Sequence, residues 1–295
     1  MIYAAVDGGG TASRLVVKDD ERTIFTSEGG STSIYSVGKE KAAENVFSLL
    51  SSFPGKIESL CLGSAGLGRE KERIFFREKL REKFPEMKLY VTDDSETLLV
   101  GGTGSLIGTV VIAGTGSICM ARLDSSTLKR KGGWGWRLGD EGSGWYIARR
   151  GVIQALRAYE HRGVPTVLTE RMCSFFNYSS PNDAIYDWNS STSTKERLAS
   201  FAVEVYKAAK EGDGVASAIL RRAGDELADL VSSMLYENEI LLAHPILFSG
   251  SVLEKNEIVR EHLLKALRED WGELCIVTGS GKAIEGGLMI ASSLK

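Results

Sequence analysis

A glycine-rich hairpin pattern occurs twice in the sequence, and this duplication is the feature that most restricts the fold. Residues 3–18 read YAAVDGGGTASRLVVK, and residues 109–124 read TVVIAGTGSICMARLD. Each copy has an apolar run, a glycine-rich turn and a second strand-like run. This pattern is typical of a β-hairpin, with glycines that supply positive φ in the turn. Two copies predict two related lobes.

Strands and helices alternate after each copy of the hairpin. The first half predicts strands at 23–27, 57–63 and 88–92 and helices at 39–53 and 70–84. The second half predicts helices at 144–160, 196–210, 215–235, 258–267 and 282–294, strands at 245–248 and 274–277, and a polar loop at 179–194. We therefore expect an α/β protein with one lobe at 1–105 plus 283–295 and a second lobe at 106–282.

Charge and composition exclude several classes of partner. The 36 basic and 39 acidic residues give a net charge of −3, so there is no electrostatic footprint for nucleic acid or an anionic membrane. No apolar stretch is long enough to span a bilayer, and the N-terminus lacks the pattern of a secretory signal. The four cysteines form no CxxC pair, which disfavours a zinc or redox site. We expect a cytoplasmic protein with free thiols.

The two glycine turns are candidate phosphate-binding sites. Asp7-Gly8-Gly9-Gly10-Thr11 is followed by a strand rather than a helix, so it is not a dinucleotide fingerprint. Backbone N–H groups can nevertheless surround an anion, the Thr11 hydroxyl can donate, and Asp7 can hold Mg²⁺ through water. Gly114-Thr115-Gly116-Ser117 repeats the arrangement in the second lobe. Either copy alone could be a plain hairpin turn, but the pair favours a triphosphate held from both sides.

Two further glycine turns are less specific. Gly250-Ser251 follows a predicted strand and fits either a close approach to adenine or an ordinary strand-to-helix turn. The TGSGKA segment at 278–283 is not a P-loop, because Ala283 stands where a Ser or Thr would bind Mg²⁺. It predicts a turn that caps the last helix, with residues 279–281 near a nucleotide.

Two adjacent carboxylates, Asp93 and Asp94, end a predicted strand, where open α/β sheets place ligand groups. A carboxylate there can take the proton of a substrate hydroxyl during phosphoryl transfer. Either residue could instead be the N-cap of the helix that follows. We assign Asp93 as the base and Asp94 as the better cap.

The segment GGWGWRLGDEGSG at 132–144 is the densest glycine cluster in the chain. Its glycines let the backbone approach a ligand, Trp134 offers a flat apolar face to a sugar ring, and Asp140 can accept hydrogen bonds from hydroxyls. The alternative is a run of turns and caps before the next helix, in which Glu141 in particular is structural.

Together these segments resemble the sugar-kinase, actin and Hsp70 ATPase superfamily. Within it they resemble the BadF/BadG/BcrA/BcrD-type ATPase family, which includes N-acetylglucosamine kinase. The order and spacing of VDGGGT, VTDD, IAGTGS, GGWGWRLGDEGS, LFSGSV and SGKAIEGGL carry the resemblance. It implies two ribonuclease-H-like (actin-like ATPase) lobes with a central cleft, ATP and Mg²⁺ as cofactors, and a homodimer.

The resemblance also implies roles for individual residues. It suggests Asp93 as the general base and Asp7 as the magnesium-side aspartate. ATP contacts fall on Gly8, Gly9, Gly10, Thr11, Gly114, Thr115, Gly116, Ser117, Gly250 and Ser251. Sugar contacts fall on Ser33, Thr115, Gly133, Trp134 and Asp140. N-acetylglucosamine kinases carry Asn where Ser33 follows Ser31-Thr32 here, so N-acetylglucosamine, glucosamine and N-acetylmuramic acid all stay open as the substrate.

Two alternatives to an amino-sugar kinase stay open. The first is an ATPase activator of a 2-hydroxyacyl-CoA dehydratase or benzoyl-CoA reductase, which shares an iron-sulfur cluster between subunits and would need thiolates such as Cys119 or Cys173. The second is a non-catalytic, sugar-responsive regulator. Regulators of this kind usually append a helix-turn-helix, and we expect none before Ile2.

Overall fold

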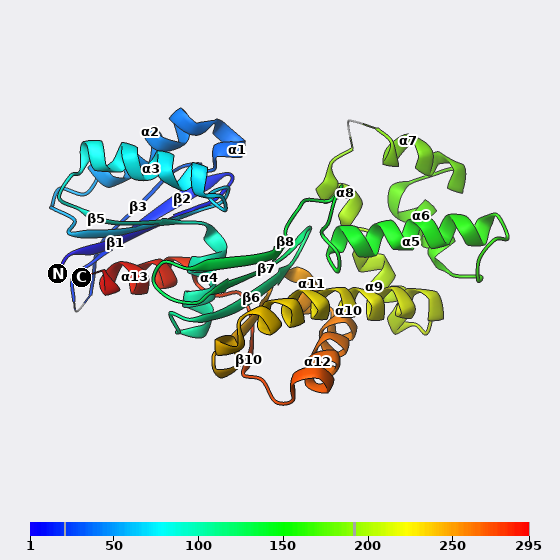
Figure 1. Ribbon diagram of the computed structural model, residues 1–295. Helices are drawn as coiled ribbons and strands as arrows, with labels where there is room; N and C mark the ends of the chain where they lie inside the picture. Colours follow the sequence, from blue (N-terminus) through cyan, green and yellow to red (C-terminus); the bar gives the residue numbers. More distant parts are fainter. Residues whose placement is uncertain (21, 191–192, 295) are drawn as a thin grey trace. The chain divides into compact units, whose positions relative to one another are not determined.

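The computed structural model describes residues 1–20, 22–190 and 193–294 (Figure 1). Two compact units share the chain. Unit 1 comprises Met1–Val110, Ala121–Leu128 and Ser280–Lys295, and unit 2 comprises Val111–Met120 and Lys129–Gly279. The division therefore assigns residues 121–128 to unit 1, whereas the sequence places them in the second lobe.

Unit 1 is built on a mixed five-stranded sheet with the strand order β3-β2-β1-β4-β5. The first three strands form an antiparallel meander, and β4 and β5 add in parallel beside β1. The strands are β1 (Tyr3–Gly8), β2 (Ala12–Lys18), β3 (Thr23–Gly30), β4 (Ser59–Ser64) and β5 (Lys88–Thr92). The helices are α1 (Ile34–Val37), α2 (Lys39–Ser51), α3 (Glu70–Lys83), α4 (Asp94–Thr103) and α13 (Ala283–Ser293).

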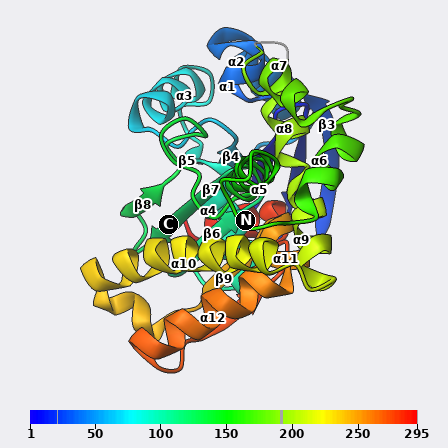
Figure 2. The ribbon, with the colours of Figure 1, turned by 90° about the vertical axis from the view of Figure 1, so that its right-hand side faces the viewer.

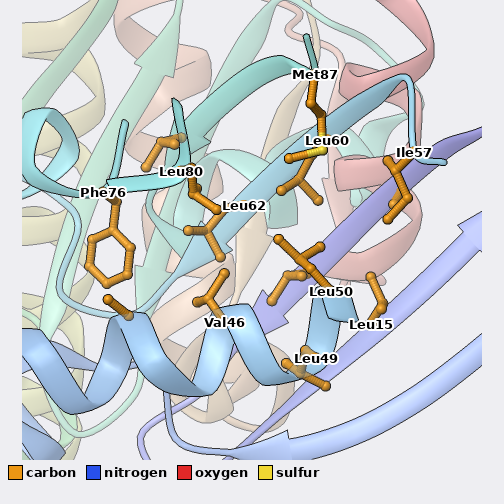
Figure 3. Packing of buried hydrophobic residues seen from close by; sticks show 14 of the residues in the cluster. Leu15, Val46, Leu49, Leu50, Ile57, Leu60, Leu62, Phe76, Leu80 and Met87 are labelled. Atoms are coloured by element: carbon orange, nitrogen blue, oxygen red, sulfur yellow. The ribbon is translucent and has the colours of Figure 1, made fainter. Parts of the chain in front are cut away.

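A hydrophobic core joins this sheet to α2 and α3 (Figure 3). Helix α2 buries Ala42, Ala43, Val46, Leu49 and Leu50, a spacing that lines one face of a helix. Helix α13 contacts β1 and β4 through a second cluster that includes Cys61, Ile290 and Ala291. Because helices cover the sheet on both faces, Ala4, Ala5 and Val6 are buried in succession, without the alternation of a half-exposed strand.

The second sheet has the strand order β10-β9-β6-β7-β8. Its strands are β6 (Gly108–Ala113), β7 (Ser117–Arg122), β8 (Leu128–Gly132), β9 (Ile246–Ser249) and β10 (Ile276–Thr278). With β6 matched to β1, β7 to β2 and β9 to β4, the order is that of the first sheet. The expected duplication is confirmed, and the fold is the α/β actin-like ATPase fold.

Unit 2 carries most of the helices between β8 and β9. They are α5 (Gly144–Tyr159), α6 (Leu168–Phe176), α7 (Ala184–Trp188), α8 (Lys195–Ala199), α9 (Ala202–Lys210) and α10 (Gly214–Glu237), with short 3₁₀ turns η1 (Pro181–Asp183) and η2 (Glu239–Ala243). Helices α11 (Ser251–Lys255) and α12 (Glu257–Trp271) follow β9. Figure 2 shows α10 and α12 lying side by side, where Gly224 lets the helices approach because a Cβ there would lie 2.9 Å from the carbonyl oxygen of Val259.

The structure corrects three sequence expectations in unit 2. The predicted helix at 196–210 is two helices, α8 and α9, separated by a short turn. The predicted loop at 179–194 contains η1 and α7, and residues 191–192 lie outside the described residues. Helix α6 was not predicted, although Leu168, Met172 and Phe176 are buried at a helical spacing of four.

Candidate functional site

The first glycine turn, residues 7–11 of unit 1, joins β1 to β2. The N–H of Gly9 donates to the carbonyl of Ala12 at 2.9 Å and closes the turn. A Cβ on Gly8 would lie 1.9 Å from Oγ1 of Thr32 and 2.5 Å from Oγ of Ser64. None of the three glycines has positive φ, so the sequence expectation on this point is wrong. Glycine is required at position 8 because the neighbouring chain lies against it.

The second glycine turn, residues 114–117 of unit 2, is fixed by the start of helix α5. The carbonyl of Gly114 accepts from the N–H of Gly144 at 2.8 Å, and the carbonyl of Thr115 accepts from the N–H of Trp145 at 3.3 Å. Again neither glycine has positive φ. A Cβ on Gly114 would meet no atom within 4 Å, so the turn has free space beside it.

A cavity of about 580 Å³ opens beside this turn, and residues of unit 2 line it. Its apolar walls come from α5, α9, α11 and the end of α8, through Ile147, Ala199, Ala202, Val203 and Val252. Gly114, Thr115 and Ser251 lie on the same lining, together with Tyr206, Lys207 and Lys255. An apolar slot beside a glycine turn suits a nucleotide, because the base fills the slot and the turn faces the phosphates.

Gly250 allows the chain to pass close to the second glycine turn. Its φ is +91°, and a Cβ there would lie 2.6 Å from the carbonyl oxygen of Ala113. Three of the residues predicted for ATP, Gly114, Thr115 and Ser251, therefore line one cavity, and Gly250 lies next to it. Sequence reasoning missed Val203 and Tyr206, because apolar residues at helical spacing gave no sign that they line a cavity rather than a core.

The corner between β5 and α4 separates the roles of Asp93 and Asp94. Asp93 is the N-cap of α4, and its Oδ1 accepts from Oγ of Ser95 at 2.6 Å and from the N–H of Glu96 at 3.1 Å. Asp94 is the first residue of the helix, and its side chain is exposed. Our expectation that Asp94 is the better cap is therefore wrong, because Asp93 alone precedes the helix and faces its free N–H groups.

The charge environment of Asp94 is unusual for an exposed carboxyl group. Protein around it limits hydration, and the negative charges of Asp93 and Asp7 add to this effect, so that the pKa of Asp94 is raised to about 6. Burial raises the pKa of Asp7 as well, partly opposed by the charge of Arg14, its partner across β1 and β2. Because the charge of Asp7 raises the pKa of Asp94, the two carboxyl groups lie close enough to interact.

The carboxylate of Asp7 fits Mg²⁺ that arrives with a nucleotide. Within residues 1–20, 22–190 and 193–294 there is no group of three or more His, Cys, Asp or Glu side chains that could hold a metal. Mg²⁺ needs no such cage, because it takes one or two carboxylates, waters and the phosphate oxygens of its nucleotide. The half-buried Asp7 at the end of β1 meets this requirement.

A buried ion pair stabilises the corner between β5 and α4, where Asp94 lies. Glu96 and Arg122 pair with side-chain exposures of 0% and 4%. Glu96 also accepts from the hydroxyls of Tyr90 and Thr92 on β5, and Arg122 donates to the carbonyl of Leu106 at 2.6 Å. Sequence reasoning did not find this network, because its two charged members are 26 residues apart in the chain.

The segment 132–144 combines left-handed glycines with exposed indoles. Gly132, Gly133, Gly135 and Gly142 have positive φ, as turns of this tightness require. Trp134 is 64% exposed, and the guanidinium of Arg130 lies 5.2 Å from its ring centroid. Trp136, 42% exposed, contacts the ring of Trp145 edge-on. Trp134 therefore presents a free aromatic face, as sugar stacking requires.

Asp140 is not a free acceptor in this structure. It is 4% exposed and has a φ of +62°, which is rare for a residue with a side chain. Its Oδ1 accepts from the N–H of Ser117 at 3.3 Å, and its Oδ2 pairs with Nζ of Lys195 at 2.7 Å. The carboxylate is thus held against the second glycine turn. Sequence reasoning missed Lys195, which follows the polar segment predicted as a loop.

Two other predicted positions, Ser33 and Gly281, lie in unit 1. Ser31 donates to the carbonyl of Gly9 at 2.9 Å, and Ser33, which is buried, precedes α1 without capping it through its side chain. A Cβ on Gly281 would lie 2.5 Å from the carbonyl oxygen of Leu98, so Gly281 packs on α4. Helix packing therefore accounts for this glycine, and the expected nucleotide near residues 279–281 stays a prediction.

Comparison with known proteins identifies the family. The sequence model of the BadF/BadG/BcrA/BcrD ATPase family matches residues 5–291. The chain belongs to this family. This BadF/BadG/BcrA/BcrD-type chain is 28% identical over 297 residues to an N-acetylmuramic acid/N-acetylglucosamine kinase of Clostridium acetobutylicum, covering 98% of this chain and 97% of the relative. It is 27% identical over 314 residues to an N-acetyl-D-glucosamine kinase of Dictyostelium discoideum, covering 100% of this chain and 98% of the relative.

Solved structures show the same fold. A protein of Chromobacterium violaceum, provisionally assigned as an N-acetylglucosamine kinase, superposes with a TM-score of 0.70 at 24% identity and 98% coverage of both chains. A ROK hexokinase of Thermus thermophilus superposes with a TM-score of 0.59 at 16% identity and 99% coverage of both chains. The family chain thus shares the actin-like ATPase fold with sugar kinases.

Proposed function

We propose that this protein is an ATP-dependent kinase that phosphorylates a hydroxyl group of an amino sugar, N-acetylglucosamine or N-acetylmuramic acid. The observation that carries the proposal is the nucleotide-sized cavity beside residues 114–117 in a chain that matches two amino-sugar kinases over nearly its whole length. In unit 1, Asp7 supplies a ligand for Mg²⁺ and Asp94 supplies the general base.

ATP has a defined place in this proposal. Adenine occupies the apolar slot between α5, α9 and α11, and the phosphates lie along residues 114–117 of unit 2. Gly8, Gly9, Gly10 and Thr11 offer backbone and hydroxyl donors. Asp7 would hold the Mg²⁺ that neutralises charge on the phosphates, a role for which its carboxylate is suited.

We assign Asp94, not Asp93, as the general base. Asp93 already accepts two hydrogen bonds as the cap of α4, whereas the exposed Asp94 has a pKa raised to about 6, which improves its ability to accept a proton near neutral pH. As the sugar oxygen bonds to the terminal phosphorus, the bond from that phosphorus to the oxygen of ADP breaks. Asp94 takes the hydroxyl proton.

The proposed sugar contacts are those expected from the sequence. Trp134 packs its exposed face on the sugar ring, and Gly133 and Thr115 border the ring on the same unit. Ser33 adds a hydroxyl from unit 1, and Asp140 fixes this pocket through its contacts with Ser117 and Lys195. Its carboxylate turns to a sugar hydroxyl only if the contact with Ser117, which is long at 3.3 Å, gives way.

The two alternative functions have less support. A cluster shared between subunits needs accessible thiolates, but Cys119 is buried, and burial raises its pKa to about 12. Cys173, the other thiol expected for such a cluster, is half-buried, and burial raises the pKa of its thiol as well. A non-catalytic regulator has no need for a base with a raised pKa at the end of β5. The relatives named for amino-sugar phosphorylation favour the kinase.

An ATP-coupled assay tests the proposal. ADP release is measured with N-acetylglucosamine, N-acetylmuramic acid, glucosamine and glucose as acceptors. Turnover with one of the two N-acetylated sugars above all others is expected. A preference for glucose would reject the amino-sugar assignment, and no sugar-dependent ADP release with any acceptor would reject the kinase.

Cellular location and assembly follow from the same proposal. No helix among the described residues is long and apolar enough to cross a membrane. A kinase that uses ATP works where ATP is kept, so we place the protein in the cytoplasm. The homodimer implied by the family resemblance stays a prediction, which the molar mass in solution tests.

A further inference from the structure

The carboxylate of Asp140 creates an electrostatic problem for the second glycine turn. A Cβ on Gly116 would lie 2.9 Å from both carboxylate oxygens, and the N–H of Ser117 donates to one of them. The negative charge therefore lies directly against the turn proposed to hold phosphates. Because the Asp140 side chain is only 5% exposed, water screens its charge weakly. Unless a cation compensates this charge, it repels a polyphosphate.

Lys195 is that cation. Its ammonium group pairs with Oδ2 of Asp140 at 2.7 Å, and 22% of its side chain is exposed. An ammonium group has three N–H donors, so two remain after the bond to Asp140. The adjacent residue, Glu196, lines the cavity together with Gly114 and Thr115, which places this part of the chain at the cavity.

The two lysines that line the cavity, Lys207 and Lys255, are less suited to this role. Lys207 pairs with Glu204 at 2.7 Å, and its side chain is 56% exposed. Lys255 is exposed on α11. Lys195 alone of the three is held by a buried carboxylate at the turn itself, so its position is fixed before any nucleotide binds. A fixed charge loses little conformational entropy on binding, which strengthens its contact with an anion.

We propose that Lys195 is a phosphate-binding residue that donates to the terminal phosphates of the nucleotide while Asp140 holds its ammonium group in place. The proposal rests on the kinase function proposed above. Two other roles are possible for Lys195: it could only neutralise Asp140, or it could bind the carboxylate of N-acetylmuramic acid. A direct phosphate contact differs from both, because the affinity lost on removal of Lys195 then depends on the number of phosphates in the nucleotide.

Calorimetric titration of ATP, ADP and adenosine tests the proposal in the wild type and in Lys195→Met. Loss of a charged hydrogen bond lowers affinity about 10- to 100-fold. We expect this loss for ATP, a smaller loss for ADP and none for adenosine. Lys195→Arg should recover part of the ATP affinity. Lys265→Met, which removes a lysine with 68% side-chain exposure on α12, is the matched control and should bind all three ligands normally.

The double variant Lys195→Met/Asp140→Asn separates contact from neutralisation. It removes both charges, so it also protects the test if Lys195→Met alone fails to fold with an unpaired buried carboxylate. ATP affinity that stays about 10-fold or more below wild type supports the phosphate contact. Wild-type affinity in the double variant would overturn it.

Four further outcomes reject the inference or its basis. Equal losses for ATP and adenosine would mean that Lys195 only maintains the cavity. Normal ATP binding with turnover lost for N-acetylmuramic acid alone would assign the cation to the sugar. A wild-type protein that binds adenosine but gains nothing from phosphates would overturn the phosphate site, and one that binds none of the three would overturn the proposed kinase itself.

Discussion

Asp93 and Asp94 are adjacent residues of the same type, but their surroundings differ. The pattern of two carboxylates at a strand end predicted both a cap and a base, and it did not determine which residue has which role. The decision depends on backbone direction at the first turn of α4, where Asp93 faces the N–H of Glu96 and Asp94 does not. Local sequence contains no signal for that direction, because either aspartate is a suitable N-cap.

Substitution of each aspartate tests the assignment. Asp94→Asn removes the base and keeps the shape, so sugar phosphorylation should fall about 10²- to 10⁴-fold. Asp93→Ala removes the cap and should cost about 0.5–2 kcal/mol of unfolding free energy. Steady-state kinetics and urea denaturation measure the two effects. Nearly normal turnover in Asp94→Asn together with a large loss in Asp93→Asn would restore Asp93 as the base.

The raised pKa of Asp94 predicts opposite pH effects on activity and stability. The ionised base is required for turnover, so kcat/KM should fall as the pH drops below about 6. Since the folded state holds this proton more tightly than the unfolded state, whose pKa is near 3.8, ionisation of Asp94 lowers stability as the pH rises from about 4 to 6.

Comparison of melting temperatures with Asp94→Asn isolates the stability effect. At pH 7 the variant should be more stable than the wild type, and the gap should close below pH 4, where both states are protonated. A wild type that is the more stable protein at pH 7 would show that its surroundings stabilise the charge on Asp94.

The buried ion pair of Glu96 and Arg122 connects helix α4 to strand β7. Arg122→Met leaves the carboxylate of Glu96 uncompensated in the core and should cost about 3–5 kcal/mol. Glu96→Gln/Arg122→Met removes both charges and should cost less than the single change. Chemical denaturation measures each value. Lys41→Met, which breaks an exposed pair with Glu44, is the control and should change stability by less than about 1 kcal/mol.

Close packing of α13 on α4 depends on glycine. A Cβ on Gly286 would lie 1.9 Å from the carbonyl oxygen of Thr97 and 2.5 Å from the backbone nitrogen of Gly101. Gly286→Ala must therefore separate the helices, at a cost of about 1–3 kcal/mol. Gly214→Ala, at the start of α10 with no atom within 4 Å of the new Cβ, should be neutral or slightly stabilising. Equal melting temperatures for the two variants would contradict this view of the packing.

Elements with strong periodicity could be predicted from the sequence, and elements set by tertiary contacts could not. The hairpins and the helices α2, α3, α5 and α10 have apolar patterns that only one structure satisfies. The break between α8 and α9 has no such pattern, since Leu198, Phe201 and Val205 are all buried on the predicted continuous helix. The pairing of Asp140 with Lys195 joins residues 55 positions apart, which no local pattern reveals.

The whole molecule repeats one strand order in two sheets, although sequence similarity is visible only in the hairpins. We attribute the similarity of the hairpins to the phosphate contacts proposed for their turns. Residues 133–245 stand where the first half has only the short segment with α1 and α2 between β3 and β4, and they supply Trp134, Asp140, Lys195 and the walls formed by α5 and α9. The duplication thus accounts for the ATPase framework, while the residues added after β8 account for the proposed sugar specificity.

We expect sugar binding to make the whole molecule more compact. A kinase must exclude water from the reacting phosphate, because water would otherwise be phosphorylated in place of the sugar, and closure around the sugar achieves this. Small-angle scattering should therefore show a smaller radius of gyration with the sugar substrate than without it. Trp134→Ala, which loses the sugar platform, should show no change at the same sugar concentration. An unchanged radius with every sugar that is phosphorylated would contradict closure on the substrate.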